Sequence, residues 1–279
     1  MKKVVLITGA SSGIGYDAAE ALAKQGHCVY AAARRVELME PLKESGVHVL
    51  KMDVTDEDSM RQGVEHVMQA EGRIDVLVNN AGYGYFGAIE NVSMAEARRQ
   101  LEVNVFGLAR LTQLVLPVMR KQGSGRIVNT SSIAGKMSIC LGGWYNVTKY
   151  AVEAFSDALR MEVKPFGIDV VKIEPGAIKT GWGVIAAKHL KESSEGTAYE
   201  EMGTRLADNM EWFYQSNLLS PPSTITKVIC RAVNSRHPHA HYCRGRFSFS
   251  GRLLHAILPT RWWDAMMLKV GKVKKLSRK

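Results

Sequence analysis

The stretch Thr8-Gly9-Ala10-Ser11-Ser12-Gly13-Ile14-Gly15 decides how the chain folds. It follows an apolar run over residues 4–7, which predicts a short buried strand, and it precedes the strong helix formers of residues 18–24. In such a strand–turn–helix unit, glycines let the backbone approach a diphosphate, and the first helical N–H groups point at its charge. The alternative is a tight turn without a ligand. We predict a dinucleotide site made of Gly9, Ser11, Ser12, Gly13, Ile14 and Gly15.

Apolar strands and helices alternate through the rest of the first 175 residues. Strands rich in Val and Ile that alternate with helices are typical of a parallel sheet with both faces covered. We therefore expect an α/β fold, a Rossmann-like doubly wound parallel sheet in a single domain. The polar region at about 180–219 is expected to be a substrate loop with short helical pieces. Strands are expected at 28–33, 47–52, 74–78, 126–130 and 169–173, and helices at about 36–44, 56–69, 95–120 and 145–164.

Composition narrows the class of protein. At 279 residues and 46% hydrophobic, the chain can bury a full core as one large domain. Its four cysteines form no C-x-x-C pair, which is typical of reduced thiols in a cytoplasmic protein. The apolar start breaks at Thr8, so we interpret it as a strand rather than a secretion signal. No uninterrupted apolar stretch approaches the roughly 20 residues that span a bilayer.

Positive charge is concentrated at the carboxyl end. Residues 220–279 hold 13 Lys and Arg against one acid and carry +12, whereas residues 1–219 hold 24 basic and 26 acidic groups and carry −2. We expect residues 1–245 to form the nucleotide-binding catalytic domain and 246–279 a basic amphipathic extension. Basic helices with tryptophan often lie on anionic membranes. The alternative, which we favour, is packing on the body or on a second subunit. No nucleic-acid module is recognisable, so no nucleic-acid partner is expected.

Four residues are candidates for acid–base chemistry. Tyr145 and Lys149 lie four residues apart, on one face of the expected helix, where an ammonium group would lower the phenol pKa from its usual value near 10. Taken alone, such a pair is also common on protein surfaces. Ser132 follows the expected strand 126–130, where its hydroxyl could bond the same reacting oxygen. Asn104 lies inside a long helix, where a short amide is unfavourable unless it has a purpose.

Together these motifs resemble the short-chain dehydrogenase/reductase family, and the extended carboxyl end is similar to its steroid and retinoid dehydrogenase branch. The order of the motifs along the chain carries the resemblance. They are the glycine-rich turn, Asn79-Asn80-Ala81-Gly82, Asn104, Ser132 with Tyr145-Asn146-Val147-Thr148-Lys149, and Pro175-Gly176 followed by Thr180.

The resemblance implies an oxidoreductase and a role for each matching residue. Tyr145 would be the general acid/base, and Ser132 would orient and polarise the substrate oxygen. Lys149 would lower the tyrosine pKa and hold the nicotinamide ribose, and Asn104 would position a water that passes protons to solvent. Further cofactor contacts are implied along the dinucleotide. Asp53 and Val54 would contact the adenine, Asn80, Ala81 and Gly82 the middle of the cofactor, and Pro175, Gly176, Ile178 and Thr180 its nicotinamide end.

Two arginines favour NADP(H) over NAD(H). An NAD enzyme usually ends its second strand with an acid that accepts from the ribose 2′-hydroxyl, whereas a 2′-phosphate needs a cation. Here Ala33 is followed by Arg34 and Arg35, and guanidinium groups bind phosphate with paired, charge-assisted bonds. The alternative is a solvated pair at a helix start, where positive charge is unfavourable. Many NADP-using relatives carry a basic residue where this chain has Ser12, which departs from that pattern.

The expected substrate is a lipophilic secondary alcohol, ketone or aldehyde, because apolar residues are abundant where the pocket should lie. Two alternatives are an epimerase or dehydratase that runs on bound NAD, and a non-catalytic dinucleotide sensor or scaffold; the intact catalytic set and the arginine pair argue against both. The resemblance implies a homodimer or homotetramer. The motif His237-x-His239-x-His241 is expected to be a strand-edge loop, and no metal site is predicted. The expected pocket residues are Met137, Ile139, Leu141, Trp144, Trp182, Val184, Ile185, Trp212, Phe213 and Tyr214.

Overall fold

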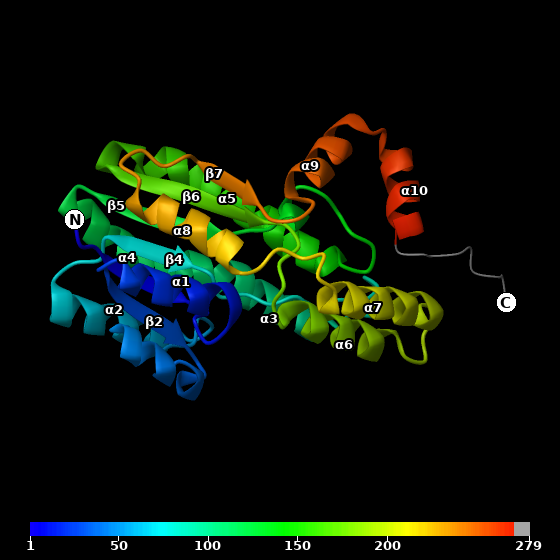
Figure 1. Cartoon of the computed structure of the whole chain (residues 1–279), viewed down its shortest axis with the longest axis horizontal. Coiled ribbons are helices and arrows are strands. Elements are labelled where there is room, and N and C mark those ends of the chain that lie inside the picture. The colour runs from blue at the N-terminus through cyan, green and yellow to red at the C-terminus, as the bar shows by residue number, and fades with distance from the viewer. Residues whose placement is uncertain (271–279) are drawn as a thin grey trace.

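A parallel sheet forms the centre of the computed structural model, which describes residues 1–270 (Figure 1). Its strand order is β3-β2-β1-β4-β5-β6-β7, and every neighbouring pair is parallel. The order reverses between β1 and β4, which is where ligands bind in such sheets, beyond the carboxyl ends of the strands. The predicted doubly wound α/β fold is confirmed. The strands are β1 Val4–Thr8, β2 Cys28–Ala33, β3 His48–Lys51, β4 Val76–Asn79, β5 Gly125–Thr130, β6 Ile168–Pro175 and β7 His241–Arg244.

Helices cover both faces of this sheet, which explains why its central strands are apolar throughout. In β1, Val5 and Ile7 belong to the core on one face, while Val4 and Leu6 belong to the core on the other. All four side chains are buried. The first face is covered by α1 Gly13–Lys24 and α8 Ser223–Asn234, and the second by α2 Glu57–Glu71, α4 Gly107–Gln122 and α5 Gly143–Val163.

One long helical segment runs from residue 94 to residue 122, close to the expected 95–120. It consists of α3 Met94–Leu101, a π-helical turn Glu102–Phe106, and α4. The segment is long and apolar enough to cross a membrane, but α4 packs against α2, β4 and β5, so we interpret it as a layer of the fold. A Cβ on Gly107 would lie 2.3 Å from the carbonyl oxygen of Val54, so only glycine allows this close packing.

Two regions differ from the sequence-based expectation. Residues 180–219 form two helices, α6 Trp182–Ser194 and α7 Glu200–Gln215, which lie side by side rather than forming a loop with short helical pieces (Figure 1). The inner faces of the two helices contribute to a small buried core that includes Ala186 and Leu190, while their outer faces are polar. In place of a helix at 36–44, the chain forms two 3-10 turns, because Pro41 lacks the N–H that a continuous helix would need there.

The carboxyl end forms an arm that stands apart from the sheet (Figure 1). We call α9 Ser248–Ile257 and α10 Thr260–Val270 the C-terminal arm. α9 contacts β7 and the turn at 133–135, whereas α10 packs chiefly on α9, so the favoured packing on the body is limited to the root of the arm. The end of the predicted basic extension, residues 271–279, lies outside the described residues.

The contact between Gly107 and Val54 predicts a stability effect. The Gly107→Ala variant should lower the free energy of unfolding by about 2 kcal/mol, because the new methyl group meets backbone that cannot move aside easily. Gly63→Ala is the matched control, since there the methyl group meets the ends of the flexible side chains of Met52 and Leu50 and no backbone. Urea denaturation measures both. Equal losses in the two variants would contradict the packing argument.

Candidate active site

The glycine-rich turn connects β1 to α1 and leaves room for a charged ligand. Gly9 has φ +68° and Gly13 has φ +58°, a region that favours glycine. A Cβ on Gly9 would lie 2.7 Å from the Cα of Ala81, so the turn also runs tightly against the loop after β4. No side chain caps the start of α1 at Ser12, and its first turn holds no acid. This set of free N–H donors fits a dinucleotide diphosphate.

Thr8 and Asn80 hold the turn against the end of β4. The Thr8 hydroxyl oxygen accepts from the backbone N–H groups of Asn80 and Ala81, both at 3.1 Å. In return, the Asn80 amide donates to the carbonyl oxygens of Thr8 at 3.1 Å and Gly9 at 3.3 Å. The side chain of Asn80 therefore shapes the cofactor turn.

Arg34 and Arg35 lie where the sequence places them, beyond the end of β2. Arg35 donates from Nη2 to the Ser11 hydroxyl at 3.3 Å, which puts its guanidinium beside the glycine-rich turn. Arg34 Nη1 lies 4.0 Å from Asp53 Oδ2, at the end of β3. Both side chains are exposed. One cation therefore lies beside the glycine-rich turn and the other beside the segment after β3, both on exposed side chains. Val54, the other expected adenine contact, is half-buried beside Gly107.

Ser132, Tyr145 and Lys149 come together beyond the end of β5. Ser132 Oγ accepts from the N–H of Ala134 at 3.1 Å, and its side chain is close enough to that of Tyr145 to lower the tyrosine pKa. Lys149 Nζ donates to the carbonyl oxygen of Thr130 at 3.0 Å and lies 5.8 Å from the centre of the Tyr145 ring. Because Tyr145 and Lys149 are one turn apart on α5, a single helix orients both groups.

Burial controls the ionisation of both groups. It raises the pKa of Tyr145 to about 12, against the lowering effect of the Ser132 side chain. Burial also lowers the pKa of Lys149 to about 8, opposed by the charge of Glu153. The expectation of a lowered tyrosine pKa is therefore wrong for this structure, since the loss of solvation outweighs the favourable interactions.

Asn104 lies in the π-helical turn and is fully buried. Its amide nitrogen donates to the carbonyl oxygen of Tyr83 at 2.8 Å and to Thr148 Oγ1 at 3.1 Å, while Oδ1 accepts from Tyr83 N–H at 3.0 Å. With both amide hydrogens used, the side chain ties the loop after β4 to α5. A Cβ on Gly82 would lie 3.0 Å from Asn104 Oδ1 and 3.8 Å from Lys149 Nζ, so this glycine keeps the space between them open.

The loop after β6 carries the residues expected at the nicotinamide end of the cofactor. Pro175 is the last residue of β6, and the N–H of Gly176 donates to the carbonyl oxygen of Arg244 at 2.8 Å. Ile178 is buried, whereas the Thr180 side chain reaches to 3.5 Å from where a Cβ on Gly13 would lie. The two ends of the expected cofactor site therefore meet at one edge of the sheet.

Aromatic rings pack around Tyr145. The ring centres of Phe86 and Trp182 lie 5.6 Å and 5.1 Å from that of Tyr145, and Tyr214 lies 6.2 Å from Trp182. Sequence reasoning missed Phe86, although an aromatic between two glycines just after a central strand was a signal. Not all expected pocket residues gather here, since Val184, Ile185 and Trp212 face solvent.

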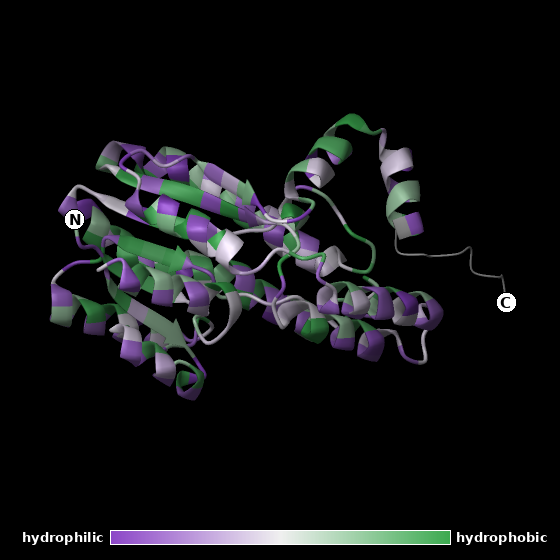
Figure 2. Cartoon of the chain, in the orientation of Figure 1, coloured by the Kyte–Doolittle hydropathy of each residue, from purple (hydrophilic) through white to green (hydrophobic). Residues whose placement is uncertain are grey.

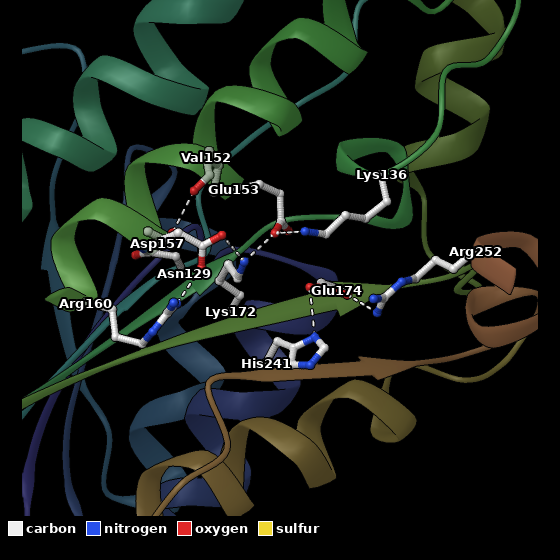
Figure 3. A network of polar contacts seen from close by, with 11 residues as sticks. Asn129, Lys136, Val152, Glu153, Asp157, Arg160, Lys172, Glu174, His241 and Arg252 are labelled. Atoms are coloured by element: carbon white, nitrogen blue, oxygen red, sulfur yellow. Dashed lines mark hydrogen bonds and ion pairs between the residues drawn. The ribbon is translucent and has the colours of Figure 1, made fainter. Parts of the chain in front are cut away.

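A buried network of ion pairs holds the next turn of α5, on the face that carries Tyr145 and Lys149 (Figure 3). Lys172 Nζ on β6 lies 2.8 Å from carboxylate oxygens of both Glu153 and Asp157, and Lys136 lies 2.8 Å from Glu153. Burial alone would raise the pKa of Glu153, but these cations lower it overall. Because Glu153 is one turn after Lys149, the network sets the rotation of the helix that carries the site. A lysine within an apolar strand was the signal for this network.

The three histidines of the H-x-H-x-H motif are exposed, and His241 Nδ1 lies 3.3 Å from Glu174. Within residues 1–270, the group of side chains that could hold a metal ion is Cys28, His48 and Glu71, whose ligand atoms lie within 4.8 Å of one another. There the Cys28 thiol donates to Glu71 Oε1 at 3.3 Å, and Glu71 also accepts from a tyrosine hydroxyl. These hydrogen bonds account for the group without a metal.

Residues 3–189 match the family model described as short chain dehydrogenase. The chain belongs to the short-chain dehydrogenase/reductase family. Like other members of this family, it is an NAD(P)-dependent dehydrogenase or reductase that transfers a hydride. A 3-ketodihydrosphingosine reductase of Bacteroides thetaiotaomicron is 45% identical over 181 residues, which cover 64% of this chain and 65% of that protein.

Solved structures of the family share the fold. A short-chain dehydrogenase from Streptomyces avermitilis has a TM-score of 0.79 and 33% identity, with 98% of each chain covered. A serine dehydrogenase complexed with NADP+ has a TM-score of 0.76 and 25% identity, covering 87% of this chain and 94% of that one.

The ion-pair network predicts a large stability difference between two neighbouring acids. Glu153→Ala should lower the free energy of unfolding by about 3 kcal/mol, because it leaves the buried Lys172 with one partner fewer. Asp157→Ala removes a carboxylate that is half-exposed and should cost about 1 kcal/mol or less. Thermal and urea unfolding compare the two, and an equal loss would mean that the buried pair does not support α5.

Proposed function

We propose that the chain is an NADP(H)-dependent oxidoreductase that interconverts a lipophilic secondary alcohol and its ketone, or an aldehyde. The observation that carries this proposal is the placement of Ser132 and Lys149 beside Tyr145, among aromatic rings. A buried acid–base group in an apolar surrounding suits a carbonyl substrate with little charge of its own.

Tyr145 is the general acid in the direction of reduction. With a pKa of about 12 its phenol keeps its proton at neutral pH and gives it to the substrate oxygen, which the Ser132 hydroxyl orients. Bound nicotinamide supplies the hydride that forms the new C–H bond at the carbonyl carbon. Oxidation is the reverse, with the alcohol proton returning to Tyr145.

Lys149 and Asn104 assist the proton transfer between Tyr145 and the substrate. With a pKa of about 8, Lys149 is mainly charged at pH 7 and stabilises the phenolate that remains on Tyr145. We place the nicotinamide ribose or a water next to Gly82, where the missing side chain leaves Lys149 and Asn104 uncovered. Asn104 acts chiefly by holding that space in shape, because its amide hydrogens are already bonded.

The arginine pair supports NADP(H) as the preferred cofactor. The Arg35 guanidinium lies beside the turn that would hold the diphosphate, and that of Arg34 lies near Asp53, an expected adenine contact, so a 2′-phosphate on the adenine ribose would be close to both. The NADP+ complex of the serine dehydrogenase, a structural neighbour, is consistent with this choice. Ser12 supplies no additional cation, so the preference depends on Arg34 and Arg35.

The aromatic surroundings of Tyr145 support a bulky apolar substrate. Phe86, Trp182 and Tyr214 present ring surfaces rather than charges to the reacting groups. The Bacteroides relative is named for a 3-keto lipid, which agrees with a long-chain ketone as the substrate class here. We also propose the expected homodimer or homotetramer, for which α5 offers exposed apolar residues such as Val147 and Tyr150.

The cofactor proposal predicts a selective effect of Arg34→Ala. NADPH binding should weaken about 10- to 100-fold through the lost charge-assisted contact with the 2′-phosphate, while NADH binding stays unchanged. Titration with nicotinamide fluorescence measures both. Arg61→Ala is a matched control, because Arg61 is an exposed arginine paired with Glu57 of its own helix.

The same titration separates the alternatives. If NADH binds more tightly than NADPH and the Arg34→Ala substitution does not change this, the proposed 2′-phosphate contact is contradicted. An enzyme that uses a permanently bound NAD would then be favoured. Cofactor binding without turnover of any lipophilic ketone, alcohol or aldehyde would instead favour a sensor or scaffold.

The assignment of the acid–base group predicts the behaviour of Tyr145→Phe. Ketone reduction should fall by a factor of about 100 to 10,000, with NADPH affinity nearly unchanged, because only the proton donor is removed. Tyr150→Phe, on the exposed face of the same helix, should keep wild-type turnover. Steady-state kinetics with a screened lipophilic ketone test this. Undiminished turnover in Tyr145→Phe would exclude the phenol as the acid.

A further inference from the structure

The C-terminal arm exposes an apolar stripe. Phe249, Leu253 and Ile257 are spaced four residues apart, so they share one face of α9, and they are 76%, 49% and 65% exposed. Trp262, at the start of α10, is 70% exposed. Figure 2 shows apolar segments on this arm, away from the sheet. Contiguous exposed apolar surface of this kind marks a docking site.

The arm is nevertheless structured and fixed to the body. Trp263 is buried, and its ring lies 4.8 Å from that of His255, which joins α10 to α9. At the root, Arg252 Nη1 lies 2.6 Å from an oxygen of Glu174, a buried residue of β6 (Figure 3). The exposed stripe is therefore held outward by specific contacts.

The positive charge of the carboxyl end indicates which kind of partner covers the apolar stripe. The arm holds three Lys and Arg and one acid, Asp264, and the sequence after it, residues 271–279 outside the described residues, holds five more Lys and Arg. Two such basic segments would repel each other, whereas an anionic lipid surface attracts basic residues and accepts apolar ones at its boundary. Tryptophan is also enriched at this boundary. We propose that the C-terminal arm docks on an anionic phospholipid bilayer, with Phe249, Leu253, Ile257 and Trp262 at the headgroup boundary.

The root of the arm lies near the proposed active site. Phe247 packs 6.0 Å from Phe213, which lies 6.1 Å from Tyr214. From there Trp182 continues to Tyr145. A docked arm would place this row of rings at the lipid surface, so that a membrane-dissolved substrate enters along apolar side chains. This second part rests on the proposed lipophilic substrate, whereas the docking itself does not.

Cosedimentation with vesicles tests the docking on the full chain without any activity assay. We expect binding to vesicles of phosphatidylcholine with phosphatidylglycerol, weakening with added salt, and little binding to phosphatidylcholine alone. The double variant Ile257→Ser with Trp262→Ser should bind about tenfold more weakly or worse, because it removes apolar anchors. Arg261→Glu with Lys269→Glu should lose the preference for anionic lipid.

Met161→Ser is the matched control, since Met161 is 69% exposed but lies on α5. It should bind vesicles like the wild type, and circular dichroism should show that all variants fold. Absence of vesicle binding by the wild type, or equal binding by all variants, would overturn the proposal. So would a fall in solution mass of the Ile257→Ser and Trp262→Ser variant without wild-type vesicle binding, which would assign the stripe to a second copy. A failure to find hydride transfer leaves the docking result unaffected.

Discussion

The reciprocal hydrogen bonds between Thr8 and Asn80 are the contact on which the rest of the site depends. They join the carboxyl ends of β1 and β4, the two strands between which the strand order reverses. A parallel sheet opens a crevice at this place because its crossovers lead away in opposite directions. These hydrogen bonds hold the backbone of Gly9 within contact of Ala81.

Helix α5 has two functions along one face. Tyr145 and Lys149 face the crevice, and Glu153, one turn after Lys149, is held to Lys172 of β6. Because the three residues are spaced four apart, the helix cannot rotate to change one contact without disturbing the others. Glu153, which stabilises the fold, and Lys149, which belongs to the site, therefore lie one helical turn apart but contact different partners.

Much of the fold and site could be predicted because the decisive signals are local. Apolar runs gave the strands, and the spacing of Tyr145 and Lys149 needed only a helical period. What could not be predicted depends on contacts between distant segments. The packing of Phe86 on Tyr145, the pairing of Lys172 with Glu153, and the balance of solvation that raises the tyrosine pKa all require the assembled protein. The helices at 182–215 were missed because their apolar faces are narrow.

The depressed pKa of Lys149 has a chemical consequence. At mildly alkaline pH a large share of this side chain is a free amine, and a free amine is a nucleophile toward the carbonyl compounds that such an enzyme admits. Condensation would give an imine and inactivate the site. The same burial that creates the free amine also restricts access, because Nζ is bonded to the carbonyl oxygen of Thr130 and surrounded by protein. The protein thus carries a reactive amine that its own fold shields from its substrates.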